Sequence, residues 1–62
     1  MVTKAELAAL IYGTEMEIAV AKSIKEADPH EYERAVFEGE STIEKLEAEL
    51  EGYKREYNTR GG

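Results

Sequence analysis

The sequence predicts an all-α protein, specifically an antiparallel two-helix hairpin of the coiled-coil type that assembles into a four-helix bundle or a higher oligomer. Three observations favour this fold class: two long segments of good helix formers, one strong break at Ala27-Asp28-Pro29-His30, and apolar residues at heptad spacing in both segments. With 62 residues, the chain is expected to form one small domain that spans 1–62.

The first segment begins and ends with recognisable helix signals. Thr3 is followed three residues later by Glu6, which is the spacing of a capping box at a helix N-terminus. Pro29 disfavours helical backbone for the residue before it, so the helix should end near Ala27. These signals predict a first helix over about residues 4–27.

The same break starts the second segment. Asp28 suits the N-cap, and Pro29 suits the first helical position, where its missing N–H costs nothing. The pattern predicts a hinge at 28–29 and a second helix over about residues 29–57. Residues 58–62 are expected to form a flexible tail.

Each predicted helix carries an apolar seam. In the second helix the seam residues follow an uninterrupted heptad spacing: Tyr32, Val36, Gly39, Ile43, Leu46, Leu50, Tyr53 and Tyr57. In the first helix they are Leu7, Ile11, Thr14, Ile18, Ala21 and Lys25. Because the hinge is short, the helices should pack antiparallel. Folding at the hinge would place Ala21 opposite Val36 and Leu7 opposite Leu50.

The first helix also has a second apolar face, which lies about opposite its seam. Its members are Ala9, Tyr12, Met16, Ala19, Val20 and Ala27. A helix that is apolar on both sides is normally covered on both sides, and a small scaffold without disulfides gains stability by association. We therefore expect a homo-oligomer, preferably a dimer. The predicted interface residues are Tyr12, Met16, Val20 and Phe37, with Tyr53 and Tyr57 as secondary candidates.

The predicted layout resembles that of the plasmid copy-control Rop proteins, in which a helical hairpin of similar length dimerises into a four-helix bundle. The resemblance is one of architecture, carried by the two helical segments and the short hinge between them. It implies a dimeric bundle. The family's RNA binding is not expected here, because the charge of this chain is unfavourable for it.

The chain is acidic, with 8 Lys and Arg against 14 Asp and Glu and a net charge of −6. Between Glu38 and Glu51 six glutamates are opposed only by Lys45. This balance argues against direct binding to nucleic acid and to anionic membranes, which both require clustered cations. Cysteine is absent, and the single histidine has no partners in a metal-binding pattern. No nucleophile and base occur together, so we expect neither an enzyme nor a cofactor.

These observations lead to one main hypothesis and two alternatives. The main one is a non-enzymatic, self-associating helical protein–protein interaction module, a small cytoplasmic regulator or inhibitor of the kind found among bacterial and phage accessory proteins. The first alternative is a protein that sequesters a small anionic ligand such as a nucleotide, held by Lys25, His30, Tyr32 and Arg34. The second is an acidic mimic of nucleic acid that would use Glu44, Glu47 and Glu51.

Overall fold

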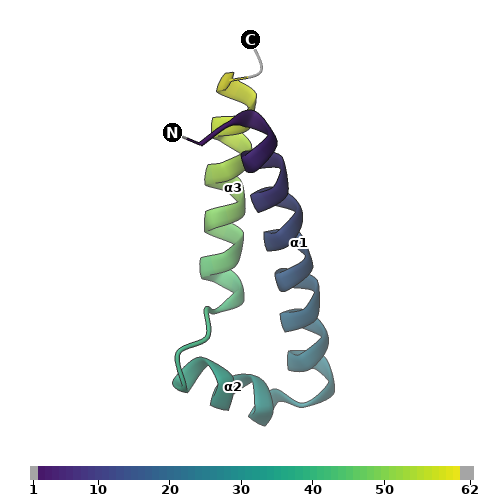
Figure 1. Ribbon diagram of the computed structural model, residues 1–62. Helices are drawn as coiled ribbons and strands as arrows, with labels where there is room; N and C mark the ends of the chain where they lie inside the picture. The colour runs from purple at the N-terminus through teal and green to yellow at the C-terminus, as the bar shows by residue number, and fades with distance from the viewer. Residues whose placement is uncertain (1, 61–62) are drawn as a thin grey trace.

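The structure, a computed structural model, describes residues 2–60, and these form three α-helices: α1 (Lys4–Ala27), α2 (Pro29–Phe37) and α3 (Ile43–Arg60). Figure 1 shows α1 and α3 running antiparallel along each other, with α2 lying across one end. The molecule is elongated, with principal extents of 43 × 18 × 14 Å. The all-α prediction is confirmed for the described residues, but the prediction of two helices is wrong.

The predicted bounds of the first helix are confirmed. Thr3 caps α1, because its Oγ1 accepts a hydrogen bond from the backbone N–H of Glu6 at 3.1 Å. At the other end the backbone N–H of Asp28 donates to the carbonyl of Ile24 at 2.7 Å. Asp28 then caps α2, since its Oδ1 accepts from the N–H of Glu31 at 3.3 Å.

The second helix does not run uninterrupted from 29 to 57, because α2 ends at Phe37. The N–H of Gly39 donates to the carbonyl of Val36, and the N–H of Glu40 donates to the carbonyl of Ala35, both at 3.0 Å. This pair of bonds is a Schellman motif, which closes a helix C-terminus and requires left-handed backbone at one residue. Gly39 supplies it, with φ of 114°. The heptad seam therefore crosses a helix break.

The third helix begins with a cap of its own. Thr42 Oγ1 accepts from the N–H of Lys45 at 3.1 Å. The N–H of Ile43 donates to the phenolic oxygen of Tyr32 at 3.0 Å, which fastens the start of α3 to α2. The helix continues to Arg60, so the predicted flexible tail at 58–62 is wrong for residues 58–60. Residues 61 and 62 lie outside the described part of the chain.

The helix break also changes which residues of α1 and α3 face each other. Lys22 forms an ion pair with Glu47 at 3.4 Å, and Lys54 forms one with Glu15 at 3.6 Å. A hairpin folded at residues 28–29 would instead place Lys22 opposite Ala35. The expected register is wrong because α2 and the linker after it lie between the end of α1 and the start of α3 and displace α3 along α1.

The buried residues of α1 and α3 nevertheless belong to the apolar seams that were predicted from the sequence. Among the described residues, the buried ones are Leu7, Thr14, Ile18, Ile43 and Leu46. All five belong to the predicted seams. Gly39, which was assigned to the second seam, is exposed, because its role is to end α2 rather than to pack.

The Gly39 conformation gives a test of the helix break. Gly39→Ala is expected to destabilise the fold by about 1–3 kcal/mol, because alanine is strained at this backbone conformation. Gly52→Ala is the matched control: Gly52 is exposed inside α3 and a Cβ there meets nothing within 4 Å, so alanine should stabilise by about 0.5–1 kcal/mol. Urea unfolding followed by circular dichroism measures both. Stabilisation by both variants would mean that an unbroken helix passes through residue 39.

Candidate functional site

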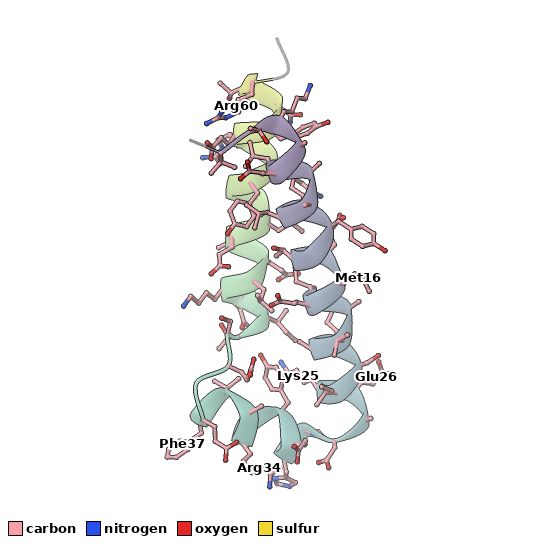
Figure 2. All side chains as sticks on the ribbon, in the orientation of Figure 1. Met16, Lys25, Glu26, Arg34, Phe37 and Arg60 are labelled. Atoms are coloured by element: carbon pink, nitrogen blue, oxygen red, sulfur yellow. The ribbon has the colours of Figure 1, made fainter. Side chains whose placement is uncertain are left out.

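The most prominent unpartnered surface is the side of α1 that faces away from α3. Its residues lie within about 100° of the helix circumference, given 3.6 residues per turn. We call this surface the outer face, and it comprises Ala5, Ala9, Tyr12, Met16, Ala19, Val20, Ser23 and Ala27. All eight are exposed, and in Figure 2 the labelled Met16 side chain points away from α3.

The outer face has the composition and spacing of a helix-packing surface. None of its residues is charged, and Tyr12 and Met16 are 67% and 51% exposed. Charged residues border the face on both flanks, with Glu15, Lys22 and Glu26 on one side and Glu6 and Glu17 on the other. Glu15 and Lys22 form ion pairs with α3. Six of the eight residues, namely Ala5, Ala9, Tyr12, Met16, Ala19 and Ser23, follow heptad spacing. An apolar face on this side of the helix was expected from the sequence, but its regular heptad spacing was not.

The total exposed surface is large for a chain of this mass. A compact monomer of 7.0 kDa is expected to expose about 4,000 Å². This chain exposes 4746 Å². The excess accords with the elongated shape of the molecule, whose principal extents are 43 × 18 × 14 Å.

A groove of about 570 Å³ adjoins the outer face. It lies where α2 diverges from α3, and its wall on α1 includes Met16, Val20 and Ile24. Glu17 and Glu40 are the charged residues in its lining. The groove was not foreseen from the sequence, because it exists only if α2 ends before α3 begins. Gly39 as a helix stop, followed by Thr42 as a cap, was the signal that could have revealed it.

The other predicted interface residues are not part of this surface. Phe37 is 91% exposed at the end of α2, and in Figure 2 it lies on the opposite side of the molecule from Met16. Tyr53 and Tyr57 are half-buried, and the Lys4 ammonium lies 4.8 Å from the Tyr57 ring centroid. Tyr57 therefore contacts α1 within one chain, and Tyr53, one turn before it on α3, is partly covered as well.

The candidate residues for an anionic ligand are only partly brought together. Lys25 Nζ lies 5.4 Å from the ring centroid of Tyr32. Arg34 is ion-paired with Glu31 at 2.8 Å, and His30 is exposed in the first turn of α2. In Figure 2 Lys25 lies above α2 and Arg34 below it. The two cations thus do not converge on one ligand position.

Within residues 2–60, no group of three or more histidine, aspartate or glutamate side chains is arranged to hold a metal ion. None of the three described helices combines the length and the apolar character needed to cross a bilayer.

Comparison with known proteins identified no relative: no family model, no curated protein and no solved structure matches the chain significantly.

Proposed function

We propose that the protein is a non-enzymatic, self-associating helical interaction module, a homodimer that pairs through the outer face of α1. The observation that carries this proposal is the uncharged, heptad-spaced outer face, which is exposed in the single chain. In the dimer, two copies of α1 and two of α3 bring four long helices together, and α1 is covered on both sides.

The energetics of a small domain support association. A chain of 62 residues buries only about 60% of its unfolded surface and is correspondingly marginal alone. Burial of apolar area contributes about 25 cal/mol per Å². Covering Tyr12, Met16 and Val20 with a second copy would therefore add a substantial share of the stability that the single chain lacks.

We further propose that the dimer acts by docking onto another protein, as a small intracellular regulator or inhibitor.

The two alternative functions, anion sequestration and nucleic-acid mimicry, have less support from the side chains. Arg34, a candidate anion ligand, is already paired with Glu31. Of the glutamates proposed for nucleic-acid mimicry, Glu47 pairs with Lys22 and Glu51 pairs with Arg55 at 3.6 Å.

Oligomeric state is the direct test of self-association. Light scattering coupled to size exclusion is expected to give twice the chain mass of 7.0 kDa, with dissociation on dilution. The melting temperature should rise with protein concentration, because a partner that binds only the folded chain stabilises it by mass action. A well-folded species of single-chain mass, with a melting temperature independent of concentration, would contradict the proposal.

A further inference from the structure

The groove beside α1 is apolar over most of its wall but carries two acids. Its volume of about 570 Å³ lies in the range of about 300–1,000 Å³ that is typical of ligand pockets. Met16, Val20 and Ile24 line it from α1, and its charged residues are Glu17 and Glu40. A group that fills this space must therefore offer apolar atoms to the wall and positive charge to the carboxylates.

No ion pair within residues 2–60 neutralises these two carboxylates. Glu17 and Glu40 are both exposed, and neither takes part in any of the ion pairs of the described chain. Five of the eight lysines and arginines are paired with other acids. The other three are Lys4, Lys25 and Lys45, none of which lines the groove. The negative charge of the lining is thus available to a partner.

We propose that the groove binds a basic amphipathic segment of a partner protein, in which an apolar side chain enters the space and flanking lysines or arginines face Glu17 and Glu40. This inference rests on the proposed function, since it specifies where the module docks and what chemistry its partner presents. A second copy of this chain is a poorer occupant. Its net charge is −6, and Phe37, its most exposed large apolar residue, is followed directly by Glu38.

The two parts of the lining have separate roles in recognition. The apolar wall favours burial of a side chain that is exposed in the free partner. The carboxylates attract a basic segment during encounter and disfavour an acidic one, because like charges placed side by side oppose binding. An amphipathic helix that lays its apolar face into a groove is a recurrent mode of protein recognition, and a basic helix meets both requirements here.

The groove is compatible with dimerisation through the outer face. The two surfaces share Met16 and Val20, but the rest of the groove wall includes Ile24 together with residues of α2 and α3, such as Val36 and Leu46. None of these three belongs to the outer face. A segment bound in the groove would therefore lie along the edge of the dimer interface.

Three short peptides of equal length test the chemistry of the partner: one of leucine and lysine, one of leucine and glutamate, and one of serine and lysine. The leucine–lysine peptide is expected to bind the natural chain. The other two should bind at least about tenfold more weakly, because each lacks either the positive charge or the apolar anchor. Fluorescence anisotropy of labelled peptides measures the affinities. Equal binding by the leucine–lysine peptide and either of the others would overturn the inference.

Paired substitutions test whether the peptide binds at the groove. Glu17→Gln combined with Glu40→Gln is expected to weaken binding of the leucine–lysine peptide about tenfold, the combined effect of two exposed ion pairs. Glu26→Gln combined with Glu33→Gln removes the same charge at exposed residues outside the groove, and should weaken it about twofold or less because solvent screens distant charges. Equal weakening by both pairs would show a general attraction to an acidic protein and overturn the inference.

Ala35→Leu tests the apolar space without changing the charge. Ala35 lines the groove from α2, and leucine is a good helix former, so circular dichroism should show an unchanged helix content. The added side chain takes the space of the partner's apolar group, and peptide affinity should fall at least about tenfold. Ala48→Leu, at an exposed site on α3, is the control that should bind normally. Unchanged binding by a folded Ala35→Leu variant would contradict the proposal.

The outcomes separate this inference from the proposed function, because light scattering reports self-association independently. A dimeric natural chain that binds no leucine–lysine peptide would overturn the inference and leave the dimer standing. Peptide binding that is indifferent to the groove substitutions would place docking elsewhere on the molecule, so the inference would fail while docking stands. Conversion of the dimer to a monomer by Ala35→Leu would show that a second copy occupies the groove, and would also overturn the inference.

Discussion

Met16→Glu is expected to weaken self-association by at least about 100-fold and to leave the chain monomeric at micromolar concentration. The substitution puts a carboxylate at the middle of the outer face, where no residue is charged. Burying an unpaired charge costs several kcal/mol, and about 1.4 kcal/mol corresponds to a tenfold change in affinity.

The variant should retain the contacts within its own chain, because Met16 is 51% exposed and glutamate has a helix propensity similar to that of methionine. Its melting temperature is expected to be lower than that of the natural chain and independent of concentration. Ala48→Glu adds the same charge at an exposed position of α3 and should leave the dimer intact.

Light scattering and concentration-dependent melting measure both variants. A second substitution on the same surface, Tyr12→Glu, is expected to act in the same direction. If Met16→Glu and Tyr12→Glu both remain dimers with unchanged affinity, association occurs elsewhere on the molecule and the outer face is not the interface.

Leu7→Ala is expected to destabilise the fold by about 2–5 kcal/mol, the range for removing a buried leucine side chain. Leu7 is the most deeply buried residue described, at 1% exposure, and it lies on the seam between α1 and α3. A domain of this size has a total stability of roughly 3–9 kcal/mol. The loss therefore approaches the whole free energy of unfolding, and much of the variant should be unfolded at 25 °C.

Leu10→Ala provides the matched control on the same helix. Leu10 is 41% exposed, so truncating it leaves no buried cavity, and a loss below about 1 kcal/mol is expected. Urea unfolding of the two variants at one protein concentration gives the comparison. Equal losses would show that the seam does not face α3 as described.

The first helix could be predicted closely because its signals are local. Thr3 and Glu6 form the cap, and Asp28 before Pro29 stops the helix, whatever else packs nearby. The apolar outer face with Tyr12 and Met16 could also be predicted, since it follows from helical spacing alone. For these features the sequence spacing directly sets the geometry.

The second helix could not be placed correctly from spacing, because heptad periodicity records where apolar residues occur and not whether the backbone between them is helical. Val36 and Ile43 keep the spacing across the break, although Gly39 has left the helix. Glycine alone was no guide, since Gly13 and Gly52 remain inside α1 and α3. What distinguishes residue 39 is the Schellman turn there and the cap at Thr42.

The sequence by itself determined that the described chain is helical, where α1 begins and ends, and that α1 has two apolar faces, because capping and periodicity are properties of neighbouring residues. Only the tertiary structure decided that α2 lies across one end of the molecule, that α3 is displaced along α1, and that a groove opens beside the outer face. Gly39 and Thr42 mark locally where the second helix breaks, but the direction of α2 and the position of α3 depend on contacts between distant residues, such as the hydrogen bond from Ile43 to Tyr32.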